Sequence, residues 1–246
     1  MRRVLRLLGL VALCALALQL ALVLRVGLMR FVDPQSTTFQ RSEILRLARE
    51  RGEVPWLQQW RDYEHIADTL KRAVIASEDA GFADHGGIDW EAVERAWERN
   101  QRAEQLAQAR NARLAPGRAA RPARIVGGST ITQQLAKNLL LSPERSFLRK
   151  GEEFVLTLAL EALLDKRRIL ELYLNHAEWG EGVFGAQAAA RHYFRTDADR
   201  LSPMQAARLA VMLPAPKRFE KRPGSAYVSG RAATIVARMP AVELPS

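Results

Sequence analysis

The chain has 246 residues, of which 48% are hydrophobic, so it can hold one membrane anchor and one domain of roughly two hundred residues. Its net charge of +10 raises the question of a nucleic-acid partner. No nucleic-acid motif stands out, and the arginine-rich stretch has little aromatic interleaving, so we expect no such partner. An anionic membrane face or a pyrophosphate-bearing ligand fits the excess at least as well. The single cysteine, Cys14, excludes a disulfide framework or a cysteine-based zinc site within one chain.

The N-terminal segment is predicted to be a membrane anchor. Residues 7–24 contain Gln19 as their only strongly polar side chain, and their length is close to the span of a bilayer core. The flanking arginines favour a cytoplasmic N-terminus. A cleaved signal peptide is the alternative, but its apolar core is usually shorter, and the small residues here lie within the run. The predicted division is a cytoplasmic tip and anchor over 1–30, a membrane-proximal linker or helix over 31–53, and a globular domain over 54–246.

The globular part is predicted to be almost all helical, because its apolar residues recur with helical spacing. Asp89 is typical of an N-cap for a helix that passes Trp97 and extends toward Arg110. Residues 154–164 are apolar nearly all round, which predicts a buried central helix. No internal repeat and no strand ladder is evident. The other expected helices are 41–51, 61–77, Ser129 or Thr130 to about Leu141, one capped by Ser142 before Pro143, 166–175, 183–194, 203–213 after the Ser202 cap, and 226–238.

An acidic pair, Glu78 and Asp79, lies at the end of one predicted helix and is followed by a glycine turn at Gly86 and Gly87. A carboxylate shielded by apolar neighbours has a raised pKa and can accept a proton. A solvated helix end is the more common role of such a pair. His85, nearby, is by itself more often structural than catalytic.

A second polar block begins with a glycine turn and continues into a helix N-terminus, whose backbone N–H groups favour anions. Its glutamines suit sugar hydroxyls, and Lys137 lies on the same face as Gln133, one turn later. An ordinary capped amphipathic helix is the alternative. The residues predicted to shape a cleft here are Ser129, Thr130, Gln133, Gln134, Lys137 and Asn138.

A basic cluster of Arg145, Arg149 and Lys150 precedes Glu153. The spacing of Arg145, Arg149 and Glu153 places cations and a carboxylate on one helix face. A surface salt-bridge ladder, which contributes little energy, is the plain interpretation. The functional interpretation is a pyrophosphate site with a second acidic residue in the cleft.

These blocks, in this order, resemble the motifs of the peptidoglycan glycosyltransferases, the enzymes that polymerise lipid II. The chain is most similar to their monofunctional biosynthetic members, the short forms without a penicillin-binding domain. The resemblance covers about residues 54–239. Its motifs are residues 78–87, residues 127–134, Arg149-Lys150-x-x-Glu153 and residues 166–175, with the later segments 178–185 and 201–216.

The resemblance implies a mainly α, lysozyme-like glycosyltransferase domain with a membrane-facing lobe, behind one N-terminal transmembrane helix. It makes Glu78 the general base that takes a proton from the 4-hydroxyl of the acceptor sugar. That oxygen attacks C1 of the donor, undecaprenyl pyrophosphate leaves, and a β-1,4 link forms with inversion. Glu171 and Tyr173 are expected to be structural. The implied site residues are Glu78 and Glu153 as catalytic, and Asp79, Ser129, Thr130, Gln133, Gln134, Lys137, Asn138, Arg145, Arg149 and Lys150 as substrate-binding.

No tightly bound cofactor and no metal site within the protein are expected, since the four histidines are scattered without ligand spacing. If a divalent cation acts, Mg²⁺ or Mn²⁺ would be held by carboxylates and the substrate's pyrophosphate, and Glu153 is the candidate carboxylate. The expected partners are lipid II, the growing glycan chain, the membrane, and proteins of cell-wall synthesis or division. The expected location is the inner membrane of a bacterium, with one membrane span and a periplasmic catalytic domain.

One segment departs from the family pattern. The link between the first two motifs is about twenty residues too long, and the excess falls in a basic insert, residues 98–124. Residues 111–124 are rich in Ala, Pro, Gly and Arg, which predicts a flexible loop. The insert is either a solvated addition or a contact for lipid head groups or substrate. Two rival functions remain, a glycan hydrolase that uses Glu78 and a non-catalytic membrane scaffold.

Overall fold

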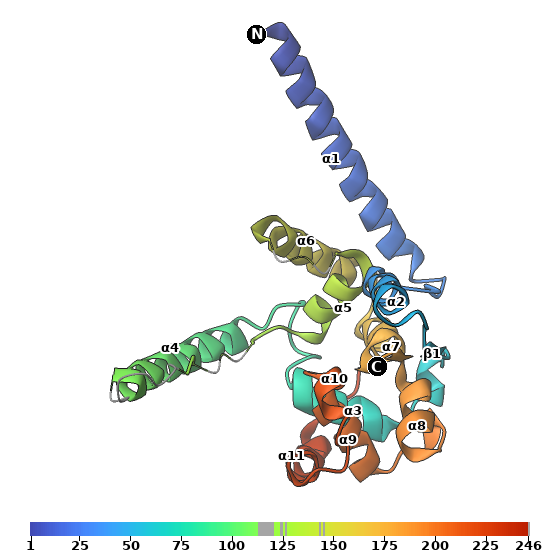
Figure 1. Ribbon diagram of the computed structural model, residues 1–246. Coiled ribbons are helices and arrows are strands. Elements are labelled where there is room, and N and C mark those ends of the chain that lie inside the picture. The colour runs from blue at the N-terminus through green and yellow to red at the C-terminus, as the bar shows by residue number, and fades with distance from the viewer. Residues whose placement is uncertain (113–120, 124, 126, 143, 145, 246) are drawn as a thin grey trace.

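The structure is a computed structural model that describes residues 1–246 except 113–120, 124, 126, 143, 145 and 246. It is mainly helical, with a helical body and one long helix, α1 (Arg2–Leu28), that extends away from it (Figure 1). Within the described chain, α1 alone is long and apolar enough to cross a membrane. It contains the predicted anchor, residues 7–24, and continues beyond it in both directions.

The last turn of the anchor is fixed to the body of the protein. Val26 and Met29 are buried in the hydrophobic core. The Arg168 side chain donates a hydrogen bond to the Met29 carbonyl oxygen at 2.8 Å and pairs with Asp33 at 2.6 Å. Arg168 also pairs with Glu171 at 2.6 Å, so the Arg168 guanidinium connects the end of the anchor to α7 (Lys166–His176), the helix on which both residues lie. This role of Glu171 agrees with the prediction that it is structural.

Two groups of packed helices form the body. In the first, α3 (Asp68–Glu78) packs against α9 (Pro203–Met212) and α11 (Ala226–Arg238). In the second, α5 (Ile131–Leu140) contacts α2 (Thr38–Arg51), α6 (Phe147–Leu163) and α7 (Lys166–His176). Aliphatic side chains from both groups, with Trp179, are fully buried in one continuous core. The remaining helical elements are α4 (Trp90–Ala112), α8 (Ala186–Phe194), α10 (Pro216–Phe219), η1 (Tyr63–His65), η2 (Ala198–Arg200) and η3 (Met239–Ala241).

The helix starts follow the side-chain chemistry of the sequence. Thr130 and Ser202 each form a reciprocal capping box, at the starts of α5 and α9. The predicted starts at residues 61 and 142 are wrong. Residues 61–67 lie outside α3, which begins at Asp68, and only Tyr63–His65 form a short 3₁₀ turn. Helix α6 begins at Phe147 with Ser146 as its cap rather than at Ser142, and Pro143 lies outside the described residues.

A small sheet contradicts the expectation of no strand ladder. Its strands are β1 (Leu57–Gln58), β2 (Glu178–Gly180) and β3 (Val183–Phe184), in the order β1-β3-β2. The prediction of helix over 183–194 is therefore wrong at its first residues. Gly182 and Gly185, at φ +75° and +82°, allow the turn into β3 and the break before α8. An added Cβ at either glycine would lie within 3 Å of backbone atoms of Pro55 or Asn175.

The predicted burial of residues 154–164 is wrong. Phe154, Val155 and Leu158 are 41–46% exposed, and Phe147 and Leu148 at the start of α6 are 98% and 84% exposed. Only one side of α6, which includes Leu156 and Leu160, packs into the core. Figure 1 shows α6 beside the base of α1, which it contacts. An apolar face next to an apolar anchor can be covered by lipid instead of by protein.

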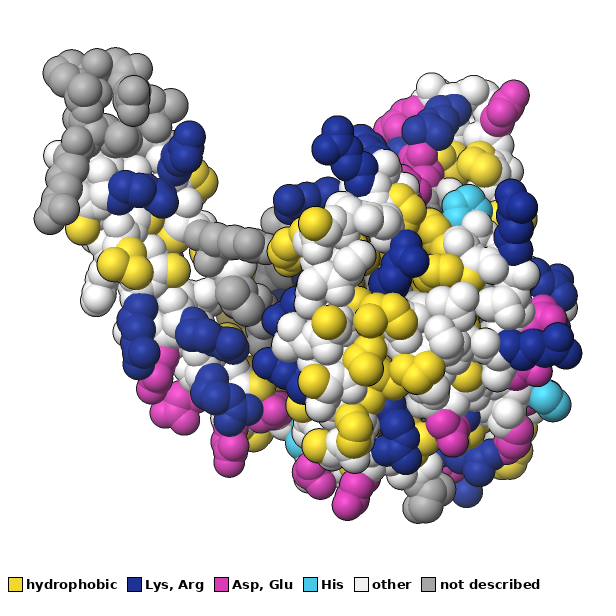
Figure 2. Space-filling model, turned by 90° about the horizontal axis from the view of Figure 1, so that it is seen from below, with side chains coloured by type: hydrophobic (Ala, Val, Ile, Leu, Met, Phe, Trp, Pro, Cys, Tyr) yellow, Lys and Arg dark blue, Asp and Glu magenta, His cyan; other side chains and the backbone are white. Residues whose placement is uncertain are grey.

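Helix α4 forms an arm that projects from the body (Figure 1). The Asp89 carboxylate accepts a hydrogen bond from the Ala92 N–H at 2.7 Å, which confirms the predicted N-cap. Figure 2 shows both basic and acidic side chains along this arm, and α4 carries four arginines and four glutamates. Because α4 continues to Ala112, the predicted loop 111–124 is helical at its first two residues. Residues 113–120 and 124 of that loop lie outside the described residues.

Candidate active site

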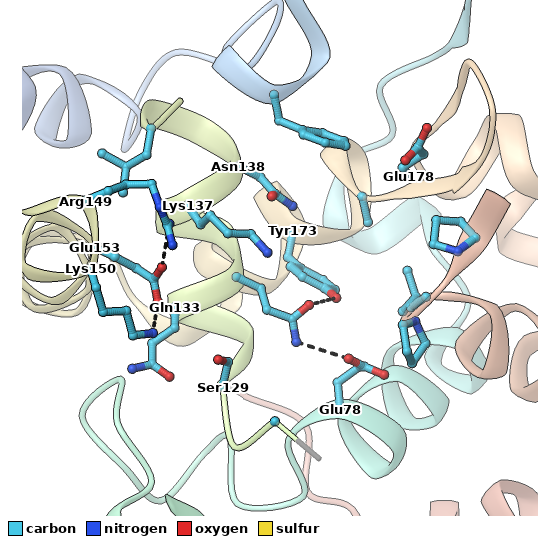
Figure 3. A pocket seen from close by; sticks show the side chains of 18 of the residues that line it. Glu78, Ser129, Gln133, Lys137, Asn138, Arg149, Lys150, Glu153, Tyr173 and Glu178 are labelled. Atoms are coloured by element: carbon cyan, nitrogen blue, oxygen red, sulfur yellow. Dashed lines mark hydrogen bonds and ion pairs between the residues drawn. The ribbon is translucent and has the colours of Figure 1, made fainter. Parts of the chain in front are cut away.

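A cleft of about 760 Å³ opens between the two groups of helices (Figure 3). Its wall takes residues from the end of α3, the length of α5, the first part of α6 and the turn before α10. Most of the predicted site residues line this wall. They are Glu78, Ser129, Gln133, Gln134, Lys137, Asn138, Arg149, Lys150 and Glu153.

Glu78 is the last residue of α3 and is half-buried at the cleft wall. Burial raises the pKa of its carboxyl, and the neighbouring charge of Asp79 adds to the rise. Hydrogen bonds from Gln134 and Ser77 oppose this shift without cancelling it. A carboxylate in this setting is a better proton acceptor than one in water.

Two further side chains hold Glu78 in place. The Gln134 amide donates to Glu78 Oε2 at 3.1 Å, and the Tyr173 hydroxyl donates to Gln134 Oε1 at 3.0 Å (Figure 3). Burial raises the pKa of Tyr173 well above its ordinary value, so the phenol keeps its proton. The Tyr173 hydroxyl fixes the orientation of the Gln134 amide, so that its NH₂ group faces the carboxylate. Tyr173 was expected to be structural, and its place in the cleft depends on the packing of α7 against α5.

Cations are held at another part of the cleft. Arg149 pairs with Glu153 Oε2 at 3.0 Å and Lys150 pairs with Oε1 at 2.5 Å. Because Glu153 is 3% exposed, its carboxylate is a fixed anchor for both cations. Lys137 reaches from α5 into the space between this group and Tyr173 (Figure 3). Arg145, the fourth predicted cation, lies outside the described residues.

Asp79 and Thr130, which were predicted to bind substrate, do not appear among the residues that line the cleft. Asp79 is buried and accepts a hydrogen bond from the Ile131 N–H at 3.0 Å, and its other oxygen lies 2.8 Å from His85 Nε2. The Thr130 hydroxyl donates to the Gly87 carbonyl at 2.6 Å. These contacts join the first sequence block to the N-terminus of α5, so both residues position the site instead of lining it.

Glu178 lines the cleft but was not predicted. It is the first residue of β2 and is 8% exposed. Burial raises the pKa of its carboxyl to about 7, although the nearby Lys217 lowers it in part. Phe39, Pro214 and Pro216 line the same cleft and were also not predicted. Segments 178–185 and 201–216 contain Glu178 and both prolines and resemble the family, but nothing in them indicates which side chains reach the cleft, so only the packed fold shows it.

The residues present do not form a ready metal site. Across the described part of the chain, no group of three or more His, Cys, Asp or Glu side chains gathers around one point. Both oxygens of Glu153, the predicted candidate, are paired with cations. Glu153 is therefore placed as the ion-pair partner of Arg149 and Lys150.

The cleft combines a shielded glutamate with cations fixed by a buried carboxylate. This arrangement suits transfer of a group from a donor with an anionic leaving group, because the base and the cations can act on different atoms. The fold and site thus define a helical group-transfer enzyme that follows a candidate membrane-spanning helix.

The comparison with known proteins gives the family. A family model described as Transglycosylase matches residues 48–240, and the chain belongs to this family. A relative from Bordetella pertussis, a biosynthetic peptidoglycan transglycosylase, is 51% identical over 87% of this chain and 82% of its own length. Relatives of the same name from Paraburkholderia phytofirmans and Burkholderia orbicola are 47% and 48% identical over 96% and 94% of this chain, and over 90% and 86% of their own lengths.

Proposed function

We propose that this chain is a peptidoglycan glycosyltransferase that polymerises lipid II into β-1,4-linked glycan in cell-wall biosynthesis. The observation that carries the proposal is that one cleft holds the shielded Glu78 carboxylate and the cations fixed by Glu153. The names of the relatives, which match the chain over most of its length, support the same substrate class.

In the proposed reaction, Glu78 removes the proton from the 4-hydroxyl of the acceptor sugar as that oxygen attacks C1 of the donor. The new C–O bond forms on the face opposite the breaking bond, so an α-linked donor gives a β-1,4 product. Gln134 and Tyr173 support this step by holding the Glu78 carboxylate in one orientation. The proton stays on Glu78 until the product leaves.

The leaving group in this reaction is undecaprenyl pyrophosphate, which carries away the electron pair of the broken bond. Arg149 and Lys150, oriented by Glu153, and Lys137 on α5 are the proposed partners of its charge. Fixed cations stabilise such a developing anion without reorganising during the reaction. Arg145, which lies outside the described residues, is proposed as a further partner of the pyrophosphate because of its place in the sequence. A divalent cation, if one acts, would be held chiefly by the pyrophosphate itself.

The proposed location is the inner membrane of a bacterium, with the cleft in the periplasm. The proposed division keeps an anchor over 1–30, a membrane-proximal segment over 31–53 and the glycosyltransferase domain over 54–246. Supporting observations are the length and composition of α1 and the exposed apolar face of α6 beside it. The arginines that flank α1 favour a cytoplasmic N-terminus. Proteins of cell-wall synthesis or division are the proposed protein partners.

A glycan hydrolase is the second candidate, because a buried glutamate also suits cleavage of a glycosidic bond. The cation group held by Glu153 argues against it, since a hydrolase that cuts glycan has no pyrophosphate to stabilise. The second rival function, a non-catalytic membrane scaffold, does not account for a glutamate whose pKa is raised at the wall of a cleft of this size.

The decisive experiment incubates the purified full-length protein in detergent with labelled lipid II, with and without Mg²⁺, beside a Glu78→Gln variant. We expect long glycan from the wild type and none from the folded variant. Release of fragments from purified sacculi, with no polymer from lipid II, would favour the hydrolase instead. Equal activity of the two proteins would remove Glu78 from the role of base.

A further inference from the structure

Glu178 lines the cleft, and one oxygen of its carboxyl group lacks a hydrogen-bond partner within the described chain. The residue is 8% exposed, yet its Oε1 atom has no hydrogen-bond partner among the described residues. The ammonium of Lys217 forms an ion pair with this oxygen at 3.8 Å, which is too long for a hydrogen bond, and is itself hydrogen-bonded to Glu43 at 2.5 Å. Burying such an oxygen without a hydrogen-bond partner costs free energy, so its position requires a reason.

The side of the cleft on which Glu178 lies indicates which ligand it meets. Figure 3 shows Glu178 on the opposite side of Tyr173 from the group formed by Arg149, Lys150 and Glu153. In the proposed reaction the donor's pyrophosphate faces that cation group, and the acceptor's 4-hydroxyl meets Glu78. The acceptor sugar then extends away from the cations, toward Glu178.

The surroundings of Glu178 suit a sugar. The ring of Phe39 and the prolines Pro214 and Pro216 line the same cleft and provide flat apolar surfaces. Phe39 is itself packed against Phe184, at 6.4 Å between ring centroids. Small-molecule sites combine apolar walls with a few placed polar groups that fix the orientation of the ligand, and Glu178 is one such group in this cleft.

We propose that Glu178 is a substrate-binding residue for the acceptor, and that its carboxyl group accepts a hydrogen bond from a hydroxyl or acetamido N–H of the acceptor saccharide. The inference rests on the proposed function, because it takes the direction of the acceptor from the roles of Glu78 and the cations. The described charged groups that face Glu178 are Lys217 and Glu220 at α10, and Glu43 and Arg46 on α2. These groups belong to a network that also includes Glu181, which pairs with Arg46 at 2.7 Å.

The test measures binding without turnover, in full-length protein that carries Glu78→Gln. The probes are labelled lipid II, added with the donor site filled by excess unlabelled undecaprenyl pyrophosphate so that only acceptor binding is read, and labelled undecaprenyl pyrophosphate alone, which keeps the pyrophosphate and the lipid but has no sugar. Adding Glu178→Leu, which keeps bulk but removes the acceptor atom, is expected to raise the Kd for lipid II roughly ten-fold. The Kd for undecaprenyl pyrophosphate is expected to stay unchanged. Adding Glu178→Gln, which keeps a neutral acceptor oxygen, should give an intermediate Kd for lipid II.

The control is Glu181→Gln, which disturbs the same charge network from a residue outside the cleft wall and should leave both Kd values unchanged. An unchanged Kd for lipid II in Glu178→Leu would overturn the inference. An equal loss of both probes would also overturn it, since Glu178 would then support the fold of the cleft. Polymerisation by protein with intact Glu78 is measured separately, so failure of the proposed function remains distinguishable from failure of this inference.

Discussion

The hydroxyl of Tyr173 is the least obvious contributor to the site, because it touches Glu78 only through Gln134. Without the hydroxyl, nothing fixes which end of the Gln134 amide faces the carboxylate. A side-chain oxygen turned toward Glu78 would repel its charge, whereas the present N–H stabilises the ionised form. The pKa of the base and its orientation therefore depend on a residue one step removed.

We expect Tyr173→Phe to lower kcat/KM for lipid II about ten-fold, the equivalent of one lost hydrogen bond. Loss of the Gln134 contact would also raise the pKa of Glu78 further, so the acidic limb of the pH–rate profile should move to higher pH. The measurement is kcat/KM against pH. Tyr63→Phe is the matched control, because Tyr63 is also buried but its hydroxyl has no hydrogen-bond partner among the described residues. An unshifted profile would contradict the positioning role.

The titration of Glu178 should also make the free energy of unfolding depend on pH. Its pKa of about 7 in the folded protein lies above the ordinary value of 4.5, so the folded state binds the extra proton between these pH values. The extra proton stabilises the folded state fully below about pH 4.5, by up to about 3 kcal/mol. This stabilisation is lost as the pH rises through 7. We expect Glu178→Gln to narrow the difference in melting temperature between pH 5 and pH 8. The same difference in both proteins would show that Glu178 does not titrate in this range.

At the scale of elements, the start of α6 works as one unit, because three of its first seven residues form a single ion-paired group. Removing the Glu153 charge would leave Arg149 and Lys150 without their shared partner. We expect Glu153→Gln to lower kcat/KM roughly thirty-fold, since two charge-assisted hydrogen bonds are weakened.

The control for this variant is Glu152→Gln, which removes an adjacent carboxylate that does not line the cleft. It should keep wild-type activity. If the two variants behave alike, the Glu153 ion pairs do not contribute to catalysis. Binding of undecaprenyl pyrophosphate is the second readout, and it should weaken only in Glu153→Gln.

Sequence patterns predicted the elements whose signals are local. Asp89, Thr130 and Ser202 cap helices because each side chain bonds a backbone N–H three residues away, and no distant contact is needed. The same patterns failed where a distant surface decides. The apolar run of α6 reads the same whether protein or lipid covers it, so its exposure could not be predicted. The strands of the small sheet are too short to show alternation.

The candidate site divides in the same way. Glu78, Gln134, Lys137 and Glu153 belong to motifs, and the structure brings them to one cleft as expected. Tyr173 and Glu178 also lie in segments that resemble the family, but like Phe39 they reach the cleft through packing between elements far apart in the sequence, and no local pattern shows that their side chains face it. Asp79 and Thr130 belong to motifs too, but they hold the two blocks together instead of facing the cleft.

At the scale of the whole molecule, the arm formed by α4 carries four arginines and four glutamates and contributes none of its residues to the cleft wall (Figure 1). At the far end of α4, the Arg110 and Asn111 side chains donate hydrogen bonds to the Arg121 carbonyl oxygen, at 2.8 and 3.1 Å. We expect deletion of residues 103–123 to change polymerisation in detergent by less than about three-fold, because no residue of the cleft is lost.

The same deletion should be compared in detergent and in vesicles that contain anionic lipid. A loss confined to vesicles would show that the arginines of the arm contact lipid head groups. A large loss in detergent would contradict the view that the arm is separate from the chemistry. Replacing Arg95, Arg99 and Arg102 by glutamine, with the arm intact, separates the effect of charge from that of length.

The attachment of the anchor by Arg168 has a consequence for the product. Because Met29 and Asp33, which follow α1, are bonded to Arg168, the helix is connected to the body rigidly and not through a flexible linker. The cleft would therefore keep one height and one tilt above the bilayer as successive sugars are added. Each new glycan strand would leave the cleft in a constant direction and at a constant distance from the membrane surface.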